Sequence, residues 1–148
     1  MSGFQIFILL SVFSLCAVLF SLWKGAAAER IAASVVVANM ALGLAIGGVS
    51  PDLAGTVRFA SDGLSAIILL VVTVRYGAPW MGGVMLFYAA QFSLHSFYLV
   101  TARSNTDYLH ALINNINFAG ISWCLIIGTA VTAHRRWRMA QAAHISST

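Results

Sequence analysis

Long apolar runs, separated by short charged or turn-forming segments, dominate the chain. A helix needs roughly 20 residues to cross a bilayer core of about 30 Å, and five runs have about that length. They cover residues 3–23, 28–49, 56–74, 79–101 and 109–133. The segments between them are too short for a soluble domain, and residues 134–148 form a basic tail. This pattern predicts an all-α, polytopic membrane protein built as a compact bundle of five transmembrane helices.

The composition supports a membrane class and argues against a nucleic-acid partner. Apolar residues make up 60% of the 148 residues and charged residues 8%, whereas soluble domains carry about 25% charged residues. A net charge of +4 would suggest nucleic-acid binding if the basic residues shared one soluble face. They are spread over connectors and the tail instead, so the expected partner is the lipid bilayer.

The basic residues also predict an orientation, because Lys and Arg of short connectors are retained on the cytoplasmic side. With the N-terminus outside, most of them fall inside. The inside set is Lys24, Arg30, Arg75, Arg135, Arg136 and Arg138, and the outside set is Arg58 and Arg103. We therefore expect the N-terminus out and the C-terminus in, within a bacterial inner membrane.

Polar residues recur at one depth in three of the runs. At about 1.5 Å per residue, Asp62 and His95 each lie roughly 9 Å from the outer surface, and Asn114 to Asn117 span depths of roughly 7–12 Å. Steps of three and four residues place the polar side chains of each run on one helix face. The stripes are Arg58, Asp62 and Ser65; Tyr88, Gln91, His95 and Tyr98; and Asp107, His110, Asn114 and Asn117. Asn115 is about 100° round the helix from Asn114 and is expected to point elsewhere.

Such groups point to a pocket, because a charge at the bilayer centre costs about 2.5–3.5 kcal/mol and normally faces a partner or a cavity. We predict an outward-facing polar pocket in which Asn114 and Asn117 meet His95 and Asp62. The candidate ligand-binding residues are Asp62, Gln91, His95, Tyr98, His110, Asn114 and Asn117. The alternative is that these groups only join the helices, with Asp62 paired to Arg58. The inner halves of the runs hold little beyond threonine, whose hydroxyl can bond its own backbone.

The residue types of this pocket suit a quinone, a lipid or another small amphiphile. His, Asp and Tyr can exchange protons, Asn and Gln can bond a carbonyl group, and phenylalanines supply apolar walls. Haem is disfavoured, because His110 lies roughly 7 Å nearer the surface than His95, whereas haem b needs axial ligands at matching depth. No HxxxH spacing or catalytic motif occurs, so we assign neither a metal site nor a catalytic residue.

The absence of a predicted soluble domain favours a non-catalytic accessory or binding subunit, which works beside other membrane-protein subunits or self-associates. Two alternatives stay open. One is a small transporter or channel built as an oligomer, and the other is a membrane enzyme that acts on a lipid-soluble substrate through His95 and Asp62. Gly43 and Gly47 have the four-residue spacing of small residues at close helix contacts, so we predict that they pack helices together.

Overall fold

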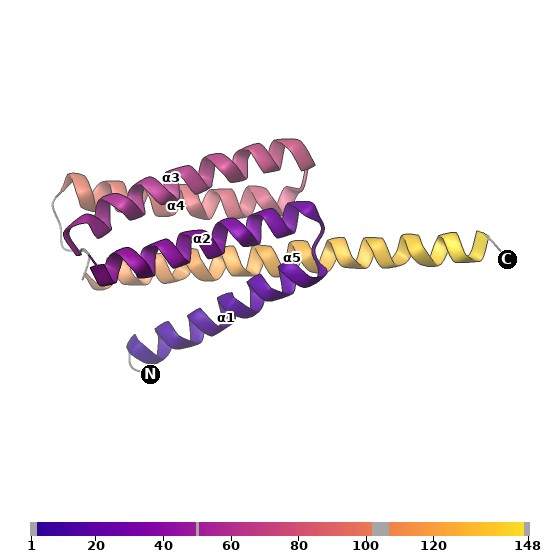
Figure 1. Cartoon of the computed structure of the whole chain (residues 1–148), viewed down its shortest axis with the longest axis horizontal. Helices are drawn as coiled ribbons and strands as arrows, with labels where there is room; N and C mark the ends of the chain where they lie inside the picture. The colour runs from indigo at the N-terminus through magenta and orange to yellow at the C-terminus, as the bar shows by residue number, and fades with distance from the viewer. Residues whose placement is uncertain (1–2, 50, 102–106, 147–148) are drawn as a thin grey trace.

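The computed structural model describes residues 3–49, 51–101 and 107–146, which form five α-helices and no strand. The helices are α1 (Gly3–Lys24), α2 (Ala27–Val49), α3 (Pro51–Tyr76), α4 (Pro79–Val100) and α5 (Tyr108–Ser146), as Figure 1 shows. The prediction of an all-α fold is therefore confirmed.

Two helix boundaries differ by more than two residues from those expected from the apolar runs. The third helix begins at Pro51 rather than at residue 56, because proline is well tolerated in the first turn, where an N–H has no helical partner. The fifth helix continues to Ser146 rather than ending at residue 133. Its last part is rich in Ala, Arg, Met and Gln, which are strong helix formers, so the basic tail extends the helix.

Four of the helices are long and apolar enough to cross a membrane. The qualifying segments are Ala27–Ile46, Leu53–Tyr76, Pro79–Val100 and Tyr108–Ile145, while α1 contributes a shorter apolar segment, Ile8–Lys24. Large apolar side chains also face outward; Val74 is 78% exposed and Val100 is 82% exposed. Contiguous apolar surface of this kind promotes aggregation in water, whereas lipid tails would cover it.

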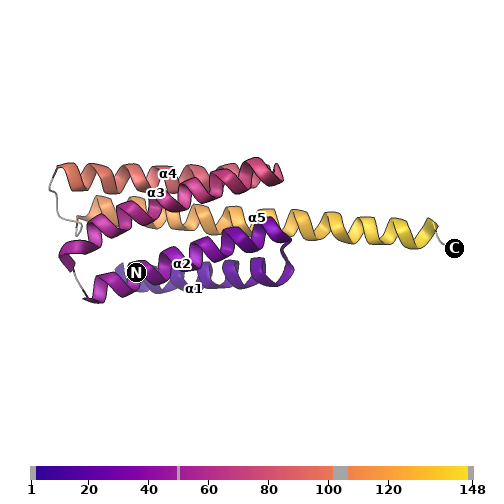
Figure 2. The same cartoon turned by 45° about the horizontal axis from the view of Figure 1, so that its top comes forward.

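The helices are arranged in a closed ring. Each packs against the next in the chain, and α5 also packs against α1 and α2. The α1–α2 and α3–α4 turns lie at one end of the bundle, which we call the turn end, and α5 projects beyond the other helices there (Figures 1 and 2). The first residues of α1, α3 and α5 lie at the opposite end, which we call the N-terminal end.

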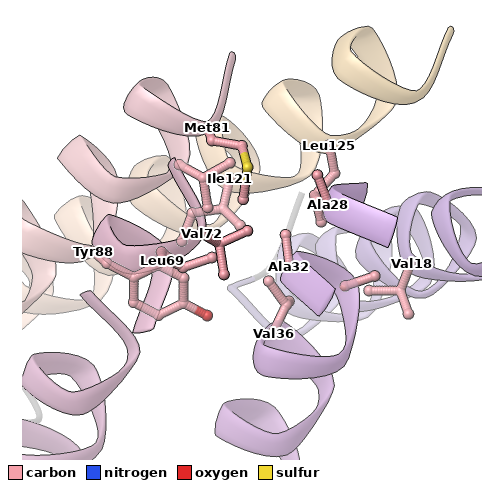
Figure 3. Packing of buried hydrophobic residues seen from close by; sticks show 12 residues of the cluster. Val18, Ala28, Ala32, Val36, Leu69, Val72, Met81, Tyr88, Ile121 and Leu125 are labelled. Atoms are coloured by element: carbon pink, nitrogen blue, oxygen red, sulfur yellow. The ribbon is translucent and has the colours of Figure 1, made fainter. Parts of the chain in front are cut away.

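The apolar core fills the half of the bundle nearest the turn end. Alanines on one face of α2 allow the neighbouring helices to approach closely. The side chains of this core include Ala28, Ala32, Val36, Leu69, Val72, Met81, Ile121 and Leu125 (Figure 3). Because these residues occupy the turn-end half, the space for a polar site lies in the other half.

Close packing of α4 against α5 depends on two glycines of α5. A Cβ added at Gly128 would overlap the Trp80 ring, and one at Gly120 would overlap the Phe87 ring. A Cβ at Gly43, by contrast, would meet no atom within 4 Å, so none of the described residues makes a close contact there. Gly47 belongs to α2, but its surroundings lie outside the described residues.

Replacement of Gly128 by alanine should therefore destabilise the bundle. We expect a loss of about 1–3 kcal/mol in the free energy of unfolding, because the added methyl group forces the Trp80 ring out of place. Gly82→Ala is the matched control, since a Cβ there meets nothing within 4 Å and alanine favours helix by up to about 1 kcal/mol. Unfolding in mixed micelles of increasing denaturing-detergent content measures both. Equal stability of the two variants would contradict this account of the α4–α5 contact.

A row of polar contacts joins α5 to α1 and α2 in the turn-end half of the bundle. The pairs are Ser14 with Ser122 at 2.6 Å, Thr129 donating to Ser21 at 2.9 Å, and Thr132 donating to Glu29 at 2.6 Å between their oxygen atoms. A threonine hydroxyl can bond its own backbone, as Thr73 does when it donates to Leu69 O at 2.7 Å, but Thr129 and Thr132 donate to other helices. Each of these hydroxyls faces an oxygen on the adjacent helix, which a single helix pattern does not reveal.

Candidate functional site

Asp62 lies at the centre of a polar cluster in the N-terminal half of the bundle. It is 1% exposed, and its Oδ1 accepts a hydrogen bond from Asn39 Nδ2 of α2 at 2.9 Å. The same Asn39 amide donates to Ser65 Oγ, one turn further along α3, at 3.1 Å. One amide thus bonds two side chains of the predicted α3 stripe and joins α2 to α3.

Two buried histidines continue the cluster from Asp62 toward the N-terminal end. His95 Nε2 lies 3.3 Å from Asp62 Oδ2, and its Nδ1 lies 3.2 Å from His110 Nε2. Both imidazoles are 4% exposed. The contact with Asp62 is close but poorly aligned, because neither Asp62 Oδ2 nor His95 Nε2 completes a hydrogen bond. Asp62, His95 and His110 therefore form a chain of polar groups across three helices.

The polar stripes of α4 and α5 face each other residue by residue. Tyr98 OH donates to Asp107 Oδ2 at 2.8 Å, His95 meets His110, and Gln91 Nε2 donates to Asn114 Oδ1 at 3.0 Å. The two helices are antiparallel, so a step of three or four residues forward along one matches the same step backward along the other. This register explains why two stripes with identical spacing pair along their length.

The same register corrects the expected partners of the asparagines. Asn114 meets Gln91 rather than His95 or Asp62, because Gln91 is the α4 residue at its level. Asn117 lies one turn deeper, is 5% exposed, and its Nδ2 makes no hydrogen bond in the described part of the chain. The alternative pairing of Asp62 with Arg58 is not observed either, since Asp62 contacts His95 instead.

Several buried polar atoms of the cluster lack a hydrogen-bond partner within the described residues. They are Asp62 Oδ2, Gln91 Oε1, His95 Nε2 and Asn117 Nδ2. A buried polar atom without a partner costs about 1–3 kcal/mol, so each is expected to meet water or a ligand. Two of the four, Asp62 Oδ2 and Gln91 Oε1, accept hydrogen bonds only, which favours a partner that carries O–H or N–H groups.

A cavity of about 510 Å³ opens beside these atoms. All five helices contribute to its wall. The polar part of the wall comprises Ser11, Asn39, Arg58, Asp62, Tyr88, Gln91, His95, Asn114 and Asn115, and the apolar part includes Leu10, Met40, Leu44, Phe118 and Ile121. This volume lies within the range of about 300–1,000 Å³ of small-molecule sites, and so does the mixture of apolar wall and few polar groups.

A second cavity, of about 650 Å³, lies next to the first between the N-terminal halves of α1 and α5. The two share Leu10, Arg58, Asn114 and Asn115 in their walls. His110 lines the second cavity, whereas His95 lines the first. The two histidines thus connect the cavities through their 3.2 Å contact.

The structure brings most of the predicted site residues together, but they do not all line the same cavity. Asp62, Gln91, His95 and Asn114 line the first cavity and His110 lines the second, whereas Tyr98 and Asn117 line neither. Tyr98 instead packs edge-on against the His110 ring, with ring centres 4.7 Å apart. Its role in the structure is to hold His110 and Asp107 at the N-terminal end.

Five polar residues of the first cavity's wall lie outside the predicted ligand-binding set: Ser11, Asn39, Arg58, Tyr88 and Asn115. Asn39 is the sole strongly polar residue in the middle of its apolar run, and that isolation was the available signal. Arg58 was assigned to the α3 stripe but not to the ligand-binding set. Asn115, which the helical spacing predicts to point away from Asn114, lines both cavities. The face of α5 that carries Asn115 borders the space between α5 and α1.

Within the described residues, no group of three or more His, Cys, Asp or Glu side chains is placed to hold a metal ion. Comparisons with protein families, with characterised proteins and with solved structures gave no match for this chain. Any function must therefore be argued from the cavities and the residues around them.

Proposed function

We propose that the chain is a multi-pass membrane protein that binds the polar head of a small amphiphile in the first cavity. It would act as a non-catalytic accessory or binding subunit beside other membrane-protein subunits or further copies of itself. A quinone, a lipid or a similar molecule fits the proposal. The observation that carries it is the 510 Å³ cavity whose wall includes buried, unmatched polar atoms of Asp62, Gln91 and His95.

Burial and chemistry both support a ligand at this place. Ionisable groups inside a membrane bundle are costly and normally face a partner or a water-filled cavity. Here the carboxylate and the imidazole already have partners on one side, Asn39 and His110. Their remaining atoms, Oδ2 and Nε2, lie 3.3 Å apart without completing a hydrogen bond, and both residues line the cavity. A head group with hydroxyl or carbonyl groups would complete the hydrogen bonds of both.

The proposed topology has five spans, with the N-terminus outside and the C-terminus inside a bacterial inner membrane. Six of the eight Lys and Arg residues fall on the inside in this orientation. The cavities then open toward the outer half of the bilayer.

Reporter fusions test this topology. Alkaline phosphatase, active only outside, is expected to be inactive when fused to the C-terminus and active when inserted between residues 102 and 106. A cytoplasmic fluorescent reporter should give the opposite result. An active phosphatase at the C-terminus would contradict the proposed orientation.

A small transporter is the second candidate function. The observation that favours it is the row of polar pairs from Ser14–Ser122 through Ser21–Thr129 to Glu29–Thr132, which continues from the cavity toward the turn end. Uptake of a solute into vesicles that contain the purified protein, and its loss in Ser21→Val, would favour this candidate over a binding subunit.

Extraction of the purified protein tests the binding function. The protein is isolated in mild detergent and extracted with organic solvent, and the extract is analysed by mass spectrometry against a mock purification. A compound present at about one per chain is the expected result. An extract identical to the mock sample would contradict the proposal.

A further inference from the structure

We infer that the bound molecule is an anionic lipid with a hydroxyl-bearing head group, whose chain lies in the second cavity. The inference rests on the proposed binding function and narrows it to one class of ligand. Three features of the described residues carry it: a cation shared by both cavities, unmatched acceptors in the first, and an apolar wall in the second.

Arg58 supplies the cation. It lines both cavities, so it stands where they meet. Its backbone oxygen accepts a hydrogen bond from Ser61, but in the described part of the chain no carboxylate lies within ion-pair distance of its guanidinium. A guanidinium binds phosphate through two parallel N–H···O bonds. A phosphodiester of a lipid would therefore be held at the junction of the two cavities.

The first cavity offers acceptors beyond this junction. Asp62 Oδ2 and Gln91 Oε1 are buried and lack hydrogen-bond partners, and both residues line the cavity. A carboxylate or an amide oxygen can only accept, so the group that satisfies it must donate. Hydroxyl groups attached beyond the phosphate would reach these atoms. A head group without donors would leave both oxygens unmatched and would therefore bind more weakly.

The second cavity is suited to bind a hydrocarbon chain. Its wall includes the polar residues Arg58, Tyr108, His110, Asn114 and Asn115, and the other six residues are apolar and belong to the two helices that flank it. They are Ile6 and Leu10 of α1 and Ala111, Leu112, Ile116 and Ala119 of α5. Leu112 and Ile116 are 40% and 57% exposed, so this wall is continuous with the lipid-facing surface. A chain could enter sideways from the bilayer while its head enters the bundle.

The three features argue against the other classes of ligand that the proposed binding function allows. A neutral quinone offers carbonyl acceptors, which would leave Asp62 Oδ2 and Gln91 Oε1 without donors and Arg58 without an anion. A zwitterionic lipid with a trimethylated amine lacks the hydroxyl donors. A free glycerol phosphate carries the anion and the hydroxyls but has nothing to place in the second cavity.

Native mass spectrometry of the full-length protein in detergent compares these ligands directly. The probes are dioleoyl phosphatidylglycerol, dioleoyl phosphatidylmethanol, dioleoyl phosphatidylcholine, a short-chain quinone and glycerol phosphate. Phosphatidylglycerol should bind most tightly, with phosphatidylmethanol about tenfold weaker because it lacks the hydroxyls, and phosphatidylcholine should bind more weakly still. Glycerol phosphate should bind far more weakly than the lipid.

Two variants with matched controls assign the binding to these residues. Arg58→Gln should weaken phosphatidylglycerol binding about tenfold through the lost charge-assisted bonds. Arg135→Gln, on the projecting part of α5, should not. Ala111→Trp should lower occupancy by filling the second cavity, whereas Ala130→Trp, an exposed α5 position outside both cavities, should not.

The outcomes separate this inference from the proposed function. Equal binding of phosphatidylglycerol and phosphatidylcholine, or an unaffected Arg58→Gln variant, would overturn the inference. Tight binding of the quinone without phosphatidylglycerol would also overturn it while leaving the proposed function intact. Glycerol phosphate binding as tightly as the lipid would overturn the role of the second cavity. If no probe binds, the inference is wrong, whereas the proposed function is decided separately by the extraction experiment.

Discussion

Replacement of Asp62 by alanine is expected to lower the free energy of unfolding by about 2–3 kcal/mol. The carboxylate is 1% exposed and accepts from Asn39 while contacting His95 at 3.3 Å. Its removal leaves the Asn39 side-chain amide with only its hydrogen bond to Ser65. The His95 imidazole also loses its contact with the carboxylate. Three helices lose a common partner, so unfolding in denaturing detergent should begin earlier.

Asp62→Asn is the control for this prediction. The asparagine retains the shape of the side chain and an oxygen that accepts from Asn39, so it should recover more than half of the lost stability. A smaller recovery would mean that the charge, rather than the hydrogen bond to Asn39, stabilises the cluster. Asp62→Ala with wild-type stability would contradict the central position given to this carboxylate.

Replacement of Glu29 by alanine is the second change with a large expected effect, about 3 kcal/mol. Glu29 is 2% exposed and stands in the first turn of α2. Its Oε2 accepts from Ala26 N at 3.0 Å, which satisfies a backbone N–H at the helix start, and its Oε1 accepts from Thr132 Oγ1 at 2.6 Å. A negative charge there also favours the N-terminal end of the helix dipole.

A double-mutant cycle with Thr132→Val separates the two contributions. We expect a coupling energy of about 1–2 kcal/mol between Glu29→Ala and Thr132→Val, because the residues share one short hydrogen bond. The remaining loss in Glu29→Ala should persist in the Thr132→Val background, since it belongs to the helix start. Additive effects of the two substitutions would contradict the contact between α2 and α5.

The polar stripes could be read from the sequence because helical spacing is a local property. Steps of three and four residues placed Gln91, His95, His110 and Asn114 on common faces before any contact between helices was known. The structure adds the register of the antiparallel α4–α5 pair, that is, which residue of one stripe faces which residue of the other. That register was accessible in principle, since a short connector between two helices makes them antiparallel neighbours.

The rest of the site depends on contacts between helices distant in the sequence. Asn39 bonds Asp62 because α2 packs against α3, and Asn115 faces a cavity because α1 borders α5 there. Neither fact follows from the spacing of polar residues within one helix. The cavity is a volume left between side chains of five helices, and the spacing of Gly43 and Gly47 within one helix predicts close packing there rather than a cavity wall.

Gly43 provides the most direct test of the central claim, that the first cavity holds an amphiphile. It lines the cavity, and a Cβ there would meet no atom within 4 Å, so Gly43→Phe should fill the cavity with little strain in the helices. Gly82→Phe places the same side chain at another open position, outside the cavity wall.

Native mass spectrometry of the three proteins, purified side by side in mild detergent, measures the fraction of chains that carry a bound molecule. We predict that the wild type and Gly82→Phe retain it equally, and that Gly43→Phe loses most of it, because the new ring occupies the space of the bound molecule. Equal occupancy in all three proteins, or none in the wild type, would contradict the account.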